Sequence, residues 1–152
     1  MFVFAGNYDL SLDDKGRVVL PLGLRKCIKE NREETLAKGF MLAPGDGNRY
    51  LDLYPTEEFE AHVQALAARY LPEDVAGQNY LRRLTSSATP IELDRQFRFI
   101  LPEKSRRTAG IEHDVYFVGA KHKIEIWPKE RWEKWQVEHE EMSVPAPSRR
   151  QG

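Results

Sequence analysis

The stretch LDDKGRVVLP (residues 12–21) recurs in modified form as LDRQFRFILP (residues 93–102). Both begin with Leu-Asp, place an arginine four positions after the aspartate, and end in Leu-Pro. Every matched residue in the second stretch lies 81 positions after its counterpart (94 − 13 = 81), and Arg25 and Arg106 keep the same offset. A constant offset over several matched positions indicates a duplicated structural unit.

The repeat continues beyond this motif. YLDLYPTEEF (50–59) matches KIEIWPKERW (123–132), now at an offset of 73, so the second copy has lost eight residues between its arginine and its aromatic-Pro pair. The first copy carries APGDGNR (43–49) in this interval, a composition typical of a loop. We therefore expect the eight residues to be missing from that loop.

Each copy predicts the same order of elements. Strands alternate with turn residues, and Gly16 suits the positive φ of a tight turn between two strands that flank DKG. Helical patterns follow each Leu-Pro and each aromatic-Pro pair. The helices are expected at residues 22–31, 56–71, 74–88 (bridging the two copies), near 103–110, and at 129–142.

These patterns predict a β-rich α+β fold. A single ββαββ unit leaves an apolar sheet face uncovered, so we expect the two copies to pack about a pseudo-two-fold axis into one barrel-like core with flanking helices. The expected organisation is a first repeat with its helix (1–73), a bridging helix (74–88), a second repeat with its C-terminal helix (89–142), and a disordered tail (143–152).

Composition narrows the class of protein. The chain has 152 residues, a formal net charge of −1 and a mean hydropathy of −0.61, with no signal-peptide pattern and no apolar window long enough for a membrane span. Cys27 is the only cysteine, so no internal disulfide or cysteine-based zinc site is expected. Charge is uneven, because residues 15–32 carry a net charge of +5 and residues 95–107 a net charge of +4. These two basic regions contain the two copies of the motif.

The motif itself allows two interpretations. In the structural one, the aspartate accepts N–H groups of the turn and pairs with the arginine across it. In the functional one, Asp13, Gly16 and Asp94 fix the two turns and orient the arginines toward a phosphate or a guanine edge. Duplication and the additional basic residues favour the functional interpretation. The predicted DNA-binding residues are Lys15, Arg17, Arg95 and Arg98.

Catalytic and metal-binding patterns are not found in the sequence. There is no HExxH, GxSxG, P-loop or GxGxxG, and the four histidines lack metal-ligand spacing. Asp46 and Asp52 are better explained as residues of a solvated loop than as a cation site. We therefore expect no enzymatic activity, no metal and no cofactor.

With these motifs identified, the chain resembles the MraZ family over residues 1–142. The resemblance rests on the paired Leu-Asp-x-x-x-Arg motifs with Leu-Pro, the opening Met1-Phe2 and the closing IEIWPKERWEKW. It implies tandem AbrB-type swapped-hairpin units, a homo-oligomeric ring, and binding to short G-containing direct repeats in duplex DNA. The implied role is regulation, usually repression, of the division and cell wall gene cluster that includes its own gene, by a cytoplasmic, nucleoid-associated protein that does not enter a membrane.

Two departures concern the second motif. Phe97 replaces the glycine usual in the family, and Pro90 replaces an acidic residue. Because phenylalanine adopts positive φ only at a cost, we expect a reshaped second turn, with Arg17 and Lys15 discriminating bases and Arg95 and Arg98 anchoring phosphates. Two other hypotheses stay open: an AbrB-like antitoxin that also binds a toxin through its tail, and an oligomeric scaffold without DNA binding.

Overall fold

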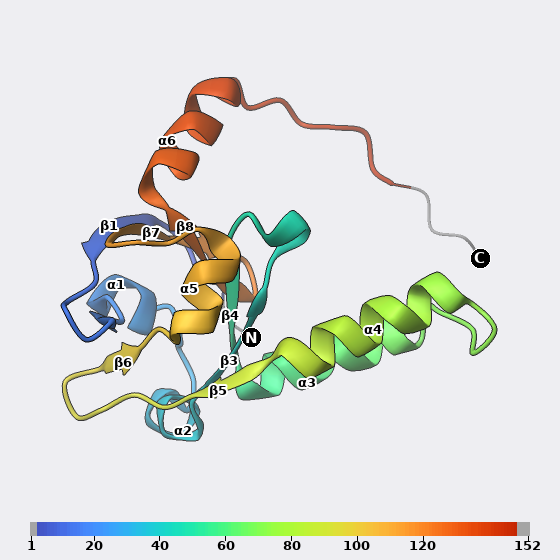
Figure 1. The fold of residues 1–152 in the computed structure, drawn as a ribbon, viewed down its shortest axis with the longest axis horizontal. Coiled ribbons are helices and arrows are strands. Elements are labelled where there is room, and N and C mark those ends of the chain that lie inside the picture. The colour runs from blue at the N-terminus through green and yellow to red at the C-terminus, as the bar shows by residue number, and fades with distance from the viewer. Residues whose placement is uncertain (1–2, 149–152) are drawn as a thin grey trace.

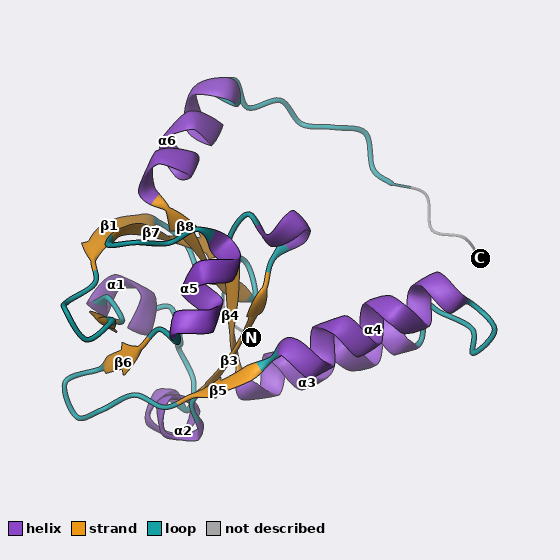
Figure 2. Ribbon diagram, viewed as in Figure 1, coloured by secondary structure: helices purple, strands orange, loops and turns teal. Residues whose placement is uncertain are grey.

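The computed structural model describes residues 3–148, so Met1, Phe2 and the last four positions of the predicted tail lie outside it. The strands are β1 (Asn7–Ser11), β2 (Arg17–Val19), β3 (Phe40–Pro44), β4 (Leu51–Pro55), β5 (Thr89–Ile91), β6 (Arg98–Ile100), β7 (Asp114–Ala120) and β8 (Lys123–Pro128). The helices are α1 (Leu22–Arg25), α2 (Arg32–Lys38), α3 (Thr56–Ala67), α4 (Val75–Ser87), α5 (Glu103–Ala109) and α6 (Lys129–Glu138), with a 3₁₀ turn, η1, at Asp46–Asn48. Figures 1 and 2 show this mixture of sheet and flanking helices, which confirms the predicted β-rich α+β class.

The strand order is symmetric about the centre of the sheet. Six antiparallel strands lie in the order β1-β7-β8-β4-β3-β5, and β2 pairs with β6 in a separate two-stranded ribbon. The order from one edge (β1, β7, β8) matches the order from the other edge (β5, β3, β4), with each strand replaced by its equivalent in the other copy. Asp52 opposes Glu125 across β4 and β8, and Val18 opposes Phe99 across the ribbon. Both are pairs of equivalent positions, so a pseudo-two-fold axis passes through them.

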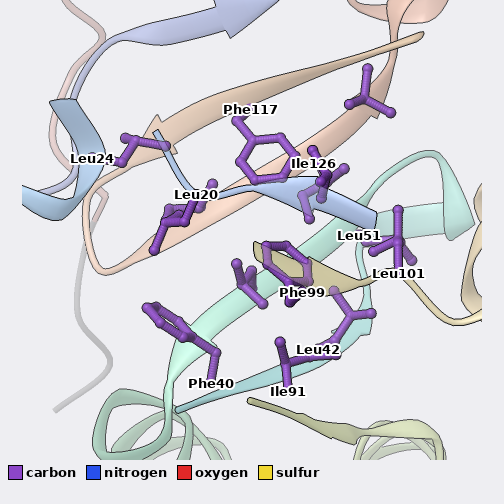
Figure 3. Packing of buried hydrophobic residues seen from close by; sticks show 14 of the residues in the cluster. Leu20, Leu24, Phe40, Leu42, Leu51, Ile91, Phe99, Leu101, Phe117 and Ile126 are labelled. Atoms are coloured by element: carbon purple, nitrogen blue, oxygen red, sulfur yellow. The ribbon is translucent and has the colours of Figure 1, made fainter. Parts of the chain in front are cut away.

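One core serves both copies. Alternation along each strand sends Phe40 and Leu42 of β3 to one face of the sheet and Met41 and Ala43 to the other. The first face is covered by the ribbon, α1 and α5, and Figure 3 shows Phe99 of the ribbon among residues of this shared core. The second face carries α3 and α4 over β3 and β4, and α6 over β7 and β8.

Four helices begin directly after a proline. Pro21, Pro55, Pro102 and Pro128 hold φ between −51° and −57° and ψ near 140° at the N-cap positions of α1, α3, α5 and α6. Proline has no N–H, and the first N–H groups of a helix have no helical partner in any case. The position of each proline therefore marks where its helix begins.

The expected helix over residues 22–31 is wrong beyond its first turn. The N–H groups of Cys27 and Ile28 bond three residues back, to Leu24 and Arg25, and this tightening brings Ile28 into the core. Asn31 then adopts a left-handed conformation and starts α2, a helix that the sequence patterns did not predict.

The position of the eight missing residues also needs correction. Phe40 pairs with Ile91 and Val115 pairs with Leu10, so Phe40 and Val115 are equivalent positions 75 apart. Six of the eight residues are therefore lost before this point, in the segment that contains α2, and only two in the β3–β4 loop. A surface helix accommodates the insertion without disturbing the sheet.

The strands on either side of the first turn are joined by the expected tight turn but do not pair with each other along their length. The Asp13 N–H bonds the Arg17 carbonyl at 3.0 Å, but beyond this pair β1 joins β7 and β2 joins β6. Each strand covers apolar surface of the other copy, which a local hairpin would leave open. After α6, residues 143–148 have no helix or strand, and none of the helices described is long and apolar enough to cross a membrane.

Candidate nucleic-acid interface

The first motif forms a turn closed by one carboxylate. Oδ1 of Asp13 accepts the backbone N–H groups of Lys15 (2.9 Å) and Arg17 (2.8 Å), and Oδ2 accepts Nε of Arg17 at 2.7 Å. Gly16 takes φ +78°, and its N–H bonds the Asp13 carbonyl. The aspartate therefore holds both the turn and the guanidinium.

The second motif has the same geometry. Oδ1 of Asp94 accepts the N–H groups of Gln96 (2.8 Å) and Arg98 (2.9 Å), and Oδ2 accepts Nε of Arg98 at 3.0 Å. Phe97 adopts φ +62°, close to the value at Gly16. The expectation that Phe97 reshapes the second turn is therefore wrong.

A stacking contact accompanies the unusual backbone of Phe97. The Arg25 guanidinium lies 3.8 Å from the centre of the Phe97 ring, and its Nε donates to the Leu20 carbonyl at 3.1 Å. A cation over an aromatic face is attracted by the ring quadrupole, which offsets part of the cost of positive φ. The Leu20 N–H also donates to the Phe97 carbonyl at 2.8 Å, so the first copy supports the second turn.

The reciprocal support comes from Arg106. Its Nε donates to the Leu101 carbonyl at 3.0 Å, and the Leu101 N–H donates to the Gly16 carbonyl at 2.8 Å. A Cβ added at Gly16 would lie 3.2 Å from a terminal nitrogen of Arg106. Arg25 and Arg106 are supporting residues that sequence reasoning did not assign, although their shared offset of 81 was visible.

The two aspartates are held in the anionic form. The backbone N–H of Arg17, followed by its side chain, lowers the pKa of Asp13 below its ordinary value, and the backbone N–H of Arg98 is the largest cause of the same shift at Asp94. Hydrogen bonds to a carboxylate favour its charged form. Each arginine uses Nε for this contact, and within residues 3–148 its two Nη groups form no hydrogen bond or ion pair with the protein. Both guanidinium ends are therefore available to an external acceptor.

The structure brings the four predicted basic residues to one side of the molecule. Figure 1 shows both turns opposite the α3–α4 helical pair, with Lys15 and Arg95 exposed at their tips. Arg17 and Arg98 line one groove of about 680 Å³ beside the ribbon. A surface with two oriented guanidinium groups and two free cations can bind phosphates and base edges of a nucleic acid.

The interpretation of Asp52 as a loop residue is wrong, because it lies in β4 and is 8% exposed. Lys123 donates to Asp52 at 2.7 Å and pairs with Glu125 at 3.0 Å, so one lysine contacts both carboxylates beside the pseudo-two-fold axis. Burial raises the pKa of Asp52 to about 6. Asp46 pairs with Arg49 instead, and in the part of the chain that the structure describes no three potential metal ligands cluster.

Comparison with known proteins agrees with this architecture. A sequence model of a family described as "MraZ protein, putative antitoxin-like" matches residues 3–76 and again residues 84–151. A protein of Lachnoclostridium phytofermentans named transcriptional regulator MraZ is 36% identical over 132 residues, covering 86% of this chain and 85% of its own. A protein of the same name from Nocardia farcinica is 36% identical over 141 residues, covering 91% and 90%, and one from Acetivibrio thermocellus is 34% identical over 136 residues, covering 88% and 86%. With both copies of the repeat matched and relatives aligned over most of their length, the chain belongs to the MraZ family.

Proposed function

We propose that this protein is a transcriptional regulator that binds duplex DNA in a sequence-specific manner, and that it is not an enzyme. One observation carries the proposal: two arginines, each held at Nε by an aspartate, present free Nη groups beside one groove. An arginine fork matches the O6 and N7 acceptors of guanine in the major groove. The regulatory names of the relatives support the same conclusion.

The exposed cations around the two forks fit a role in phosphate binding. Lys15 and Arg95 have no carboxylate partner among the described residues, whereas the exposed cations Lys38, Arg49 and Arg107 are paired with acids. Neutralising phosphates releases counterions, so affinity should fall steeply with salt. A chain with a net charge of −1 thus carries a local basic surface rather than a general affinity for polyanions.

The geometry of the second turn changes the expected division of labour between the arginines. Unequal roles are expected only if Phe97 reshapes the second turn. The two turns instead have the same hydrogen bonds. We therefore assign Arg17 and Arg98 equivalent roles in base recognition. Lys15 and Arg95 then contribute mainly to phosphate contact.

The finer biological role follows the family resemblance. In this proposal the protein acts in the cytoplasm on the nucleoid and represses the division and cell wall gene cluster that includes its own gene. It binds direct repeats as a homo-oligomeric ring. Exposed apolar side chains on α4 (Val75, Tyr80) and α6 (Trp135, Val137) support self-association through helices. A ring aligns many equivalent surfaces, which suits direct repeats and raises affinity by avidity.

The test compares Arg17→Ala and Arg98→Ala for binding to a selected duplex and to random duplex, over a salt titration. Each substitution should cost about 1–3 kcal/mol of specific binding and lower the ratio of specific to random affinity to a similar extent. Arg82→Ala, which changes an exposed arginine on α4, is the control and should leave the ratio unchanged.

Each alternative hypothesis gives a different result in this assay. A scaffold would show no DNA binding in the wild type. An antitoxin would bind DNA in the same way and would also retain a toxin on copurification. If neither arginine variant changed the ratio of specific to random affinity, the motif would have only a structural role.

A further inference from the structure

The ribbon of β2 and β6 carries a second feature beside the arginines. Arg17 opposes Ile100 and Val19 opposes Arg98 in the antiparallel register, while Val18 and Phe99 between them are buried. Residues directly opposite share a face, and residues two apart along a strand share it too. Arg17, Val19, Arg98 and Ile100 therefore lie together on the outward face.

The two aliphatic residues of this face are exposed and occupy equivalent positions. Val19 is 39% exposed and Ile100 is 59% exposed, and they are 81 positions apart, the offset of the repeat. Single exposed aliphatic residues are common on protein surfaces. Here both copies place a β-branched aliphatic side chain two residues after the clamped arginine, and both of these side chains are exposed.

The spacing of the ribbon relates each aliphatic residue to an arginine. Opposed residues lie about 5 Å apart between Cα atoms, and residues two apart on a strand lie roughly 7 Å apart. Successive bases of one strand are about 3.4 Å apart along the helix axis. An arginine on a guanine edge would therefore place the opposing aliphatic side chain over a base one or two positions away.

Only one group in the major groove offers apolar contact at such a position, the C5-methyl group of thymine. We propose that Val19 and Ile100 are specificity-determining residues that contact thymine methyl groups beside the guanines bound by Arg17 and Arg98. This inference rests on the proposed function, since it assumes that the ribbon faces the major groove. It assigns the selected site a thymine within two base pairs of a guanine.

The experiment removes the methyl groups from the DNA. The probe is the duplex that the full chain selects from a randomised pool, resynthesised with deoxyuracil in place of each thymine near a guanine. Burying one methyl group should strengthen binding roughly fourfold, so the wild type should lose about that factor at each contacted position. Val19→Ser and Ile100→Ser replace the aliphatic side chain by one without a methyl group, and each should bring the affinity ratio of thymine to deoxyuracil duplex close to one at its own position.

Val75→Ser is the matched control, since Val75 is exposed on α4, away from the ribbon. It should leave the ratio of thymine to deoxyuracil affinity as in the wild type. A wild type that binds the selected duplex specifically but does not distinguish deoxyuracil would overturn this inference while leaving the proposed function standing. So would a selected site with no thymine near its guanines, whereas absence of any specific DNA binding would overturn both.

Discussion

At the scale of single residues, the aspartates of the two motifs act alike. Asp13 and Asp94 each accept three hydrogen bonds from their own turn, two from backbone N–H groups and one from the arginine. These contacts fix the backbone and the guanidinium with one side chain, so the structural and functional interpretations of the motif describe the same geometry. Because the pKa of each aspartate is lowered, both stay ionised at neutral pH.

Asp52 leads to a prediction on stability. Burial raises its pKa in the folded protein to about 6, above the ordinary 3.8. Between these pH values the folded state binds a proton that the unfolded state releases, so the free energy of unfolding falls as pH rises. A shift of about two units corresponds to about 3 kcal/mol in total, from well below pH 3.8 to well above pH 6.

Asp52→Asn should abolish this contribution, since the amide does not titrate. The difference in unfolding free energy between variant and wild type should therefore move in favour of the variant by about 2 kcal/mol from pH 4 to pH 6. Urea denaturation at several pH values measures this difference. A difference that stays constant with pH would show that Asp52 ionises normally beside Lys123.

At the scale of elements, equivalent segments of the two copies contribute to one core. Leu20 follows β2 and Leu101 follows β6, and both are fully buried. Leu20→Ala and Leu101→Ala should each cost about 2–5 kcal/mol of stability, through lost burial and the cavity that remains. Chemical denaturation of the two variants should give similar values.

The control for these substitutions is Leu22→Ala. Leu22 lies in α1 and is 52% exposed, so its loss should cost less than about 1 kcal/mol. If one of the buried leucines proved as tolerant as Leu22, the two copies would not share the core equally.

At the scale of the whole molecule, neither copy is complete. β1 depends on β7 and β2 depends on β6, so each copy supplies strands that pair only with the other. A chain divided between Leu71 and Pro72, in the connection from α3 to α4, should give two fragments that do not unfold cooperatively alone. Mixing them should restore near-ultraviolet circular dichroism and a single unfolding transition. A fragment that folds by itself would show that one copy can satisfy its own strands.

Local sequence patterns were enough to predict the duplication, the β-rich class and the proline-marked helix starts, and to find the four basic residues of the two turns. These features depend on local chemistry: periodicity, turn residues and the missing N–H of proline. Asp-x-x-x-Arg likewise closes on itself within five residues, so its geometry follows from the motif.

The way the two copies join depends on contacts between segments far apart in the chain. The pairing of β1 with β7, the contacts of Arg25 with Phe97 and of Arg106 beside Gly16, and the burial of Asp52 against Lys123 all involve partners distant in sequence. Phe97 shows the same dependence, because its positive φ occurs beneath an arginine from the other copy. Local propensity cannot predict such outcomes, since the energies that favour them come from contacts that exist only once the two copies have packed together.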